Sequence, residues 1–349
     1  MKVVKFRADL SILAYSERAL SYRKNEQNQD TPSMMSAAVT DKRSGARKVI
    51  AVGGAKGGVG KSLLAANLGV YLASHGHRTV VVDLDLGAAN LHLYLGVWAL
   101  KHRINDFLDK KVDDLAAITV PTAYGPDLIG GGSNRLGSAN LPFARKLKLM
   151  RAIRRMDADV VILDLGGDTC YNILDFFLLA DYGLVMTTCD PAAYLDAYTF
   201  IKMALYRRLV RLFGPESSYR KFRDPNLLSI VKRFLEPDQT ETPRMMTELL
   251  EQARTGAPQR HHLIETALAQ FQPHLVVNMA DDAGEVDALV RRMQKVSRRV
   301  LSVRLPLAGT IPTHPGITRS AHDLKPEVAL NPYGVLARAV RRIVKHGMN

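Results

Sequence analysis

The sequence predicts an α/β protein with a doubly wound, mostly parallel sheet flanked by helices. From about residue 48 onward, short apolar runs alternate with amphipathic helical segments, which is the order typical of parallel sheets covered on both faces. Most of these runs are continuously apolar, as expected for strands that are buried on both sides. A glycine-rich segment at 53–62 separates the first run from the first helix, and this is the context that a phosphate-binding loop requires.

Composition narrows the class of protein. The 349 residues are 47% hydrophobic and carry a net charge of +14, with a sequence pI near 9.8. This indicates a globular chain and favours contact with nucleic acid, an anionic membrane surface or an acidic protein, without choosing among them. Cys170 and Cys189 form no CxxC or zinc pattern, so neither a disulfide framework nor a metal site is indicated. With no membrane-spanning apolar stretch and no secretion signal, we expect a cytoplasmic protein.

The chain divides into an arm and one large domain. Residues 1–47 are predicted to be a disordered N-terminal arm, because polar residues dominate part of it, and residues 48–346 a phosphate-loop domain. The segment at about 204–273 has no convincing strand, and we interpret it as a helical insertion or as solvated helices that cover a sheet face. Strands are expected at 49–53, 79–83, 128–130, 160–164, 183–188, 274–278 and 305–311.

The glycine-rich segment carries the first part of a nucleotide site. Glycines let backbone N–H groups turn toward phosphate oxygens, and the positive end of the following helix adds to the field. Lys61 would reach the β- and γ-phosphates, and Ser62 would ligate Mg²⁺. The candidate nucleotide-binding residues here are Gly57, Gly58, Val59, Gly60, Lys61, Ser62 and Leu63.

Carboxylates at two strand ends carry the second part. Asp83 and Asp85 follow the strand at 79–83, and alternation along an extended segment puts them on one face. Such a pair suits a Mg²⁺ water shell and an attacking water, although strand-end aspartates also accept ordinary turn hydrogen bonds. Asp164 ends the strand at 160–164 and precedes Gly166 and Gly167, which fits a Walker B element that holds Mg²⁺ through water. These parts predict phosphoryl transfer to water.

The stretch KGGVGKS at 56–62 resembles the signature of the deviant Walker A ATPases of the MinD/ParA family, and the resemblance covers about 48–345. The segment at 190–202 is most similar to that of FlhG/FleN-like flagellar number regulators. The resemblance implies a P-loop ATPase that binds ATP and Mg²⁺ and forms a homodimer on ATP binding. In that dimer Lys56 would touch the partner's nucleotide. It also implies roles for four more residues: water orientation by Asp85, the Mg²⁺ shell for Asp83, adenine reading by Asn278, and packing beside the base for Pro312.

The candidate catalytic residues are therefore Lys56, Lys61 and Asp85, and the candidate metal site comprises Ser62, Asp83 and Asp164. Three residues depart from the family pattern, namely Ala55, Leu63 and Asp168. Asp168 would oppose nucleotide binding by Coulomb repulsion if its side chain pointed toward the γ-phosphate. The amino-terminal partner motif of the flagellar regulators is not evident, which bears on the flagellar assignment more than on the ATPase assignment.

Three basic helical segments, at 145–155, 286–299 and 335–345, suggest surfaces for a partner. The last has an apolar stripe, so it is expected either to lie in a membrane interface, as in MinD, or to dock on the sheet. We predict an ATP-dependent switch that controls the position or number of a cellular structure, with flagella favoured. It would act in the cytoplasm, on the inner membrane face or at the cell pole, with an activator or a flagellar GTPase-like protein as partner. The alternatives are a ParA-like partition ATPase that binds DNA non-specifically, a non-hydrolysing nucleotide-binding scaffold, and a metabolic or carrier enzyme.

Overall fold

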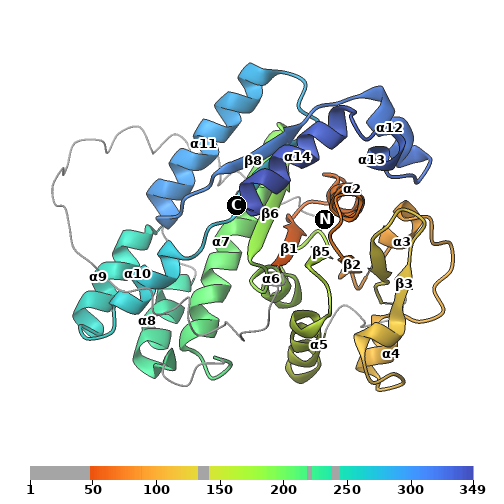
Figure 1. The fold of residues 1–349 in the computed structure, drawn as a ribbon. Coiled ribbons are helices and arrows are strands. Elements are labelled where there is room, and N and C mark those ends of the chain that lie inside the picture. The colour runs from red at the N-terminus through yellow and green to blue at the C-terminus, as the bar shows by residue number, and fades with distance from the viewer. Residues whose placement is uncertain (1–47, 88, 133–140, 218–221, 237–243, 349) are drawn as a thin grey trace, which may run out of the picture. The chain divides into compact units, whose positions relative to one another are not determined.

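The computed structural model describes residues 48–87, 89–132, 141–217, 222–236 and 244–348, so the predicted arm at 1–47 lies outside the described residues. An eight-stranded sheet of order β3-β4-β2-β5-β1-β6-β7-β8 forms the centre of this part of the chain (Figure 1). Every neighbouring pair is parallel except β3 and β4. The predicted doubly wound, mostly parallel sheet is thus confirmed. The strands are β1 Lys48–Gly53, β2 Thr79–Asp83, β3 Thr119–Pro121, β4 Asp127–Ile129, β5 Val160–Asp164, β6 Tyr182–Thr187, β7 His274–Asn278 and β8 Leu307–Ile311.

The sequence did not predict β3. This strand has three residues, pairs antiparallel with β4 at the edge of the sheet, and ends on Pro121. Proline lacks the N–H that a central strand would need, so it is tolerated only at such an edge. A run this short carries no readable periodicity.

Helices cover both faces of the sheet. The chain moves from β1 to β2 in one direction and from β5 to β6 and β7 in the other, so right-handed crossovers place the connecting helices on opposite faces. Accordingly α2 packs against α14, whereas α6 and α11 pack against α7. The helices are α2 Lys61–Ser74, α3 Leu91–Tyr94, α4 Ile104–Leu108, α5 Phe143–Arg155, α6 Tyr171–Phe177, α7 Pro191–Phe213, α8 Pro225–Leu235, α9 Met246–Gly256, α10 His262–Ala269, α11 Ala283–Leu301, α12 Pro315–His322, α13 Glu327–Leu330 and α14 Val335–Met348, with a 3₁₀ turn at Leu115–Ile118.

The core follows from the apolar runs. The strands β1, β2 and β5 at the middle of the sheet are buried along nearly their whole length, because helices cover them from both sides. Between β6 and β7 the described residues contain helices only, and α8 packs against both α7 and α9. The extent of a helical insertion at 204–273 stays a prediction.

The C-terminal helix α14 is docked on the sheet. Its apolar stripe, Leu336, Val340 and Ile343, is fully buried, and the helix contacts β8 and α2. The hydroxyl of Tyr182 donates to the carbonyl oxygen of Ile343 at 3.2 Å. The stripe is therefore occupied by the protein core and would reach a membrane only after the helix undocked. Across the residues described, no helix is both long and apolar enough to cross a bilayer.

Candidate functional site

The loop between β1 and α2 has the backbone of a phosphate cradle. Gly58 and Gly60 have φ values of +78° and +94°, in the left-handed region that favours glycine. A Cβ atom added to Gly57 or Gly58 would meet no atom within 4 Å, so this part of the loop faces open space. A Cβ atom on Gly60 would lie 2.4 Å from Nδ2 of Asn278. Gly60 directly precedes the first turn of α2, so the loop brings a candidate anion to a helix N-terminus.

Lys61 is buried at the start of α2. Its Nζ donates to the carbonyl oxygen of Lys56 at 2.9 Å, which folds the side chain back over the loop. Burial lowers the pKa of Lys61, and the charges of Asp164, Asp85 and Asp168 partly offset this. The lysine therefore lies between the loop and the candidate acidic residues, where an anion would compensate its charge.

Asp83 and Asp164 lie opposite each other at the ends of the adjacent strands β2 and β5. Both are buried, with exposed fractions of 0% and 1%. Asp83 accepts hydrogen bonds from the backbone N–H groups of Asp85 and Leu91, each at 3.1 Å. Asp164 bonds to the side chain of Ser62, yet its Oδ1 is buried without a partner in the described part of the chain. The structure thus brings the three predicted metal-site residues together.

The electrostatics of this carboxylate pair fit a cation. Burial, followed by the charge of Asp164, raises the pKa of Asp83 well above its usual value. Burial likewise raises the pKa of Asp164 to about 7. A divalent cation would offset the desolvation of both groups and would satisfy the unpaired oxygen. In the described ranges no group of three or more His, Cys, Asp and Glu residues could hold a metal. This is compatible with Mg²⁺, which keeps several waters and takes phosphate oxygens as ligands.

A second glycine-rich turn, after β5, packs directly on the phosphate loop. A Cβ atom on Gly167 would lie 3.0 Å from the backbone N of Gly57 and 3.2 Å from Nζ of Lys61. A Cβ atom on Gly166 would lie 3.3 Å from the carboxyl carbon of Asp85. These approaches explain why glycine occupies both positions. They also place Asp85 beside the turn, whereas its predicted role with an attacking water stays a prediction.

Asp168 does not point into the loop as an isolated charge. Its Oδ1 accepts a hydrogen bond from the backbone N–H of Cys170 at 2.6 Å, just before α6 begins. Its charge still acts on Lys61 through space. The departure at Asp168 therefore has a local structural use in the turn that leads into α6.

Asn278 ends β7 and is paired with Ile311, the last residue of the neighbouring strand β8, which Pro312 directly follows. Nδ2 of Asn278 donates to the carbonyl oxygen of Val59 at 2.9 Å, and the side chain is 4% exposed. This hydrogen bond connects the end of β7 to the phosphate loop. Leu63 is buried in the core, so only its backbone could contact a nucleotide. The adenine-side roles of Asn278 and Pro312 stay predictions.

Lys56 has a partner that the sequence did not reveal. Its Nζ lies 2.6 Å from Oδ2 of Asp190, the residue just before α7, and both side chains are partly exposed. The contact arises because β6, which leads to α7, lies next to β1. Local sequence patterns do not predict the order of strands in a sheet, so the ion pair between Lys56 and Asp190 could not be predicted from them.

The sheet, the loop and the carboxylates at the ends of β2 and β5 together define the P-loop NTPase class. A family model places the chain within that class, since the CobQ/CobB/MinD/ParA nucleotide binding domain matches residues 50–342. The chain belongs to this family, as the sequence resemblance had indicated.

Curated relatives and solved structures agree with this assignment. The chain is 28% identical to the antiactivator FleN of Pseudomonas aeruginosa over 199 residues, which cover 54% of this chain and 70% of FleN. It is 31% identical to the flagellum site-determining protein YlxH of Helicobacter pylori over 170 residues, covering 46% of this chain and 54% of YlxH. The cell division ATPase MinD of Pyrococcus furiosus has the same fold, with a TM-score of 0.57 at 17% identity over 85% of this chain and 97% of MinD.

Proposed function

We propose that this protein is a dimerising ATPase switch of the MinD/ParA type, which binds ATP with Mg²⁺ and hydrolyses it to ADP. The observation that carries the proposal is the convergence of Lys61, Asp85 and the Asp83–Asp164 pair on one loop that faces open space. A sequence motif alone would not require these groups to meet. Positioned cations, a metal and an oriented water are the parts that phosphoryl transfer needs.

Each residue has a defined task in this proposal. The backbone N–H groups of residues 57–63 and the Lys61 ammonium bind the phosphate oxygens. Ser62, Asp83 and Asp164 would hold Mg²⁺, directly or through its waters, and the ion would supply positive charge beside the phosphates. Asp85 orients the attacking water, and Gly166 and Gly167 allow backbone to approach the γ-phosphate.

In the proposed dimer, Lys56 leaves Asp190 and contacts the nucleotide of a second copy. Lys56 is partly exposed and lies on the loop, so it can change partner without disturbing the core. A surface ion pair of this kind contributes about 0–1 kcal/mol, which a phosphate would readily outweigh. The ATP-bound pair would then present a surface for a partner protein, an anionic membrane or DNA.

The process that the switch serves is proposed from the relatives. FleN is named as an antiactivator and YlxH as a flagellum site-determining protein, so control of flagellar number or position is favoured. The protein would act in the cytoplasm, peripherally on the inner membrane face or at the cell pole. Deleting the gene in its host should change the number of flagella per cell, counted by electron microscopy. A segregation defect with normal flagella would favour a partition role instead.

ATP turnover of the wild type and of Asp85→Asn tests the enzymatic part. We expect the variant to bind a fluorescent ATP analogue with wild-type affinity and to lose about 10²- to 10⁴-fold in turnover, the range typical of a lost positioning or acid–base group. If neither protein hydrolyses ATP but both bind it, the result would contradict the ATPase proposal and favour a non-hydrolysing nucleotide-binding scaffold.

Light scattering with and without ATP tests the dimer. Lys56→Ala should bind nucleotide as a monomer and lose the ATP-dependent dimer, whereas Lys101→Ala, at an exposed lysine outside the loop, should retain it. Unchanged dimerisation of Lys56→Ala would refute the role of this lysine across the dimer.

A further inference from the structure

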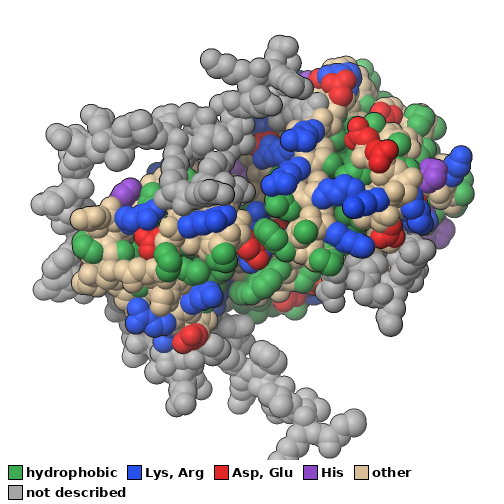
Figure 2. All heavy atoms as spheres, turned by 90° about the horizontal axis from the view of Figure 1, so that it is seen from below, with side chains coloured by type: hydrophobic (Ala, Val, Ile, Leu, Met, Phe, Trp, Pro, Cys, Tyr) green, Lys and Arg blue, Asp and Glu red, His purple; other side chains and the backbone are tan. Residues whose placement is uncertain are grey.

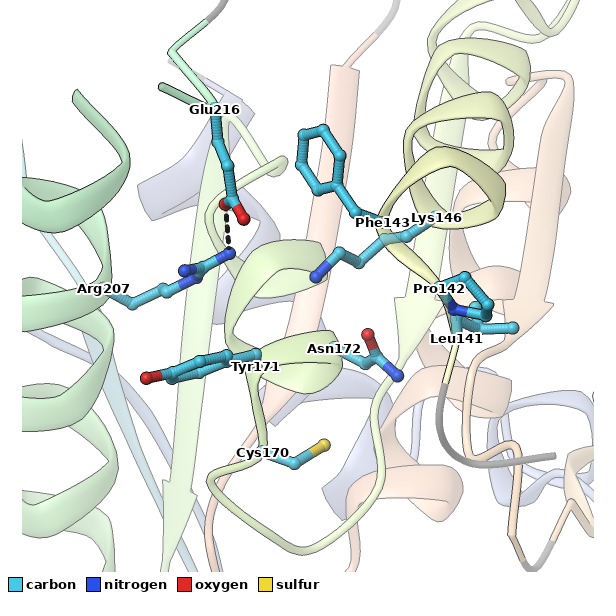
Figure 3. Close-up of a pocket in the computed structure, with 9 residues that line it drawn as sticks. All are labelled: Leu141, Pro142, Phe143, Lys146, Cys170, Tyr171, Asn172, Arg207 and Glu216. Atoms are coloured by element: carbon cyan, nitrogen blue, oxygen red, sulfur yellow. Dashed lines mark hydrogen bonds and ion pairs between the residues drawn. The ribbon is translucent and has the colours of Figure 1, made fainter. Parts of the chain in front are cut away.

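A cavity that no phosphate-loop residue lines lies between the start of α5, the start of α6 and α7 (Figure 3). It has a volume of about 500 Å³. Its polar lining includes Lys146, Arg207 and Glu216, and its rim includes Phe143 and Tyr171. None of these residues takes part in the proposed hydrolysis, so the pocket needs an explanation of its own.

Two of the lining residues, Lys146 and Arg207, belong to a cluster of buried charges. Asp175 on α6 is fully buried and accepts hydrogen bonds from Nε and Nη2 of Arg207 at 2.8 and 2.9 Å. Lys146 and Arg211 also form ion pairs with Asp175, and Arg207 pairs with Glu216 at 2.7 Å. The side chains of Lys146 and Arg207 are only 5% and 6% exposed.

This cluster has more positive than negative groups. Among the residues that the structure describes, Lys146, Arg207 and Arg211 pair with the carboxylates of Asp175 and Glu216, which leaves a surplus of one positive charge. Buried cations are costly unless they are paired, so a cluster with a surplus favours an additional anion at its open side. Figure 3 shows the side chains of Lys146 and Arg207 pointing toward each other, and both bind the carboxylate of Asp175, which the figure does not draw.

The rim of the pocket is aromatic and exposed. Phe143 is 39% and Tyr171 is 65% exposed. The Arg207 guanidinium lies 4.4 Å from the centre of the Tyr171 ring. Exposed aromatic residues beside a buried arginine are typical of the anchor positions of protein interfaces.

We propose that this pocket binds an acidic segment of a partner protein, whose carboxylate contacts Lys146 and Arg207 and whose neighbouring apolar side chain packs on Phe143 and Tyr171. Charge complementarity supports this occupant, because the whole chain carries a net charge of +14. Lys and Arg side chains are also prominent on the face at the bottom of Figure 1, where α4, α5 and α8 are labelled (Figure 2). A long-range field of this sign steers acidic partners toward the pocket.

The position of Asp175 links the pocket to the nucleotide site. Helix α6 begins at Tyr171, four residues after Gly167, which packs on the phosphate loop. A partner carboxylate that competes with Asp175 for Lys146 would loosen α6 from α5 and α7 and so shift the turn at Gly167. This coupling rests on the proposed function, whereas binding in the pocket does not.

Fluorescence anisotropy with a labelled acidic peptide tests the binding. The probe is the hexapeptide EEFEEF at 150 mM salt, and its neutral counterpart QQFQQF is the first control. We expect EEFEEF to bind the full chain, and QQFQQF to bind at least tenfold more weakly. Lys146→Met should weaken EEFEEF at least tenfold, whereas Arg151→Met, which removes the same charge from an exposed position of α5, should change it less than twofold.

Tyr171→Ser provides a variant that leaves the buried charges in place, and it should weaken EEFEEF about fivefold. Equal weakening by Lys146→Met and Arg151→Met, no binding to the wild type, or full displacement by equimolar inorganic phosphate would overturn the proposal. Affinity for a fluorescent ATP analogue is measured in the wild type and in Tyr171→Ser, which keeps the Lys146–Asp175 ion pair, and it should be the same in both. If the wild type does not bind the ATP analogue, the proposed function is refuted, whereas the proposal of peptide binding in the pocket is unaffected.

Discussion

Two buried polar groups at the phosphate loop lower the stability of the ligand-free protein. Within the described residues, one carboxylate oxygen of Asp164 is buried without a hydrogen-bond partner, and the buried amino group of Lys61 donates to a backbone carbonyl oxygen. Each group would be better solvated outside the protein, so the fold retains them at a cost. Binding of nucleotide and Mg²⁺ would offset the desolvation free energy of both groups.

The buried carboxylate of Asp164 should destabilise the nucleotide-free protein above pH 7. Its pKa is about 7 in the folded state and lies near 3.8 in the unfolded state. Between these values the folded state binds more protons, so stability falls as the pH rises. Asp164→Asn does not titrate and should therefore increase the free energy of unfolding at pH 8 by roughly 1–4 kcal/mol, measured by urea denaturation without Mg²⁺. Equal stability of variant and wild type at pH 8 would contradict this.

The ion pair between Lys56 and Asp190 should weakly oppose dimerisation. Asp190→Asn removes the charge but keeps a residue type that caps α7. Freed from its intrachain partner, Lys56 should bind the second nucleotide more readily, and the ATP-dependent dimer should tighten about two- to fivefold, since an exposed pair contributes 0–1 kcal/mol. Sedimentation equilibrium measures the change. The double variant with Lys56→Ala should show no such gain, and a gain there would assign the effect to something other than this lysine.

At the scale of elements, the glycines of the loop differ in what they tolerate. Gly60 has a positive φ, and an added Cβ atom would collide with Asn278, whereas one on Gly57 would meet nothing within 4 Å. Gly60→Ala should therefore lower the free energy of unfolding by roughly 1–3 kcal/mol, since strained backbone has that cost. Gly57→Ala should leave thermal stability unchanged. Equal melting temperatures for the two variants would show that the contact with Asn278 does not constrain the loop.

The final helix α14 should behave as part of the core. Ile343 is fully buried, so Ile343→Ala should cost roughly 2–5 kcal/mol, as large-to-small core substitutions do. Arg341 is exposed on the same helix, and Arg341→Ala should change stability by about 0.5 kcal/mol or less. Chemical denaturation compares the two variants. Loss of membrane association with unchanged stability in Ile343→Ala would favour the interfacial helix instead.

At the scale of the whole molecule, folding and ligand binding should be linked. A ligand that binds only the folded state adds about 2.7 kcal/mol of stability at one hundred times its Kd. Mg²⁺ with ATP should therefore raise the melting temperature by a few degrees over EDTA alone, by the usual scaling for a domain of this size. The shift should disappear in Lys61→Ala, which lacks the buried ammonium. A shift of equal size in that variant would place the binding elsewhere.

The fold class and the phosphate loop could both be predicted from the sequence, because both depend on local patterns. Continuous apolar runs mark strands buried on two faces, and glycines followed by lysine and serine mark a phosphate loop wherever a strand precedes and a helix follows. Asp83 and Asp164 were predictable for the same reason, since each ends a recognisable strand. The edge strand β3 carried no such pattern.

Contacts between residues that are far apart in the sequence could not be predicted without the tertiary structure. The order of the strands places β6 beside β1 and so brings Asp190 to Lys56, 134 positions apart. Packing of α5, α6 and α7 gathers Lys146, Asp175 and Arg207 into one cluster and leaves a pocket beside it. Contacts with β8 and α2 bury the apolar stripe of α14, for which the sequence had also allowed a membrane interface. Local sequence sets what each segment prefers, but long-range contacts depend on topology, and topology is settled by burial across the whole molecule.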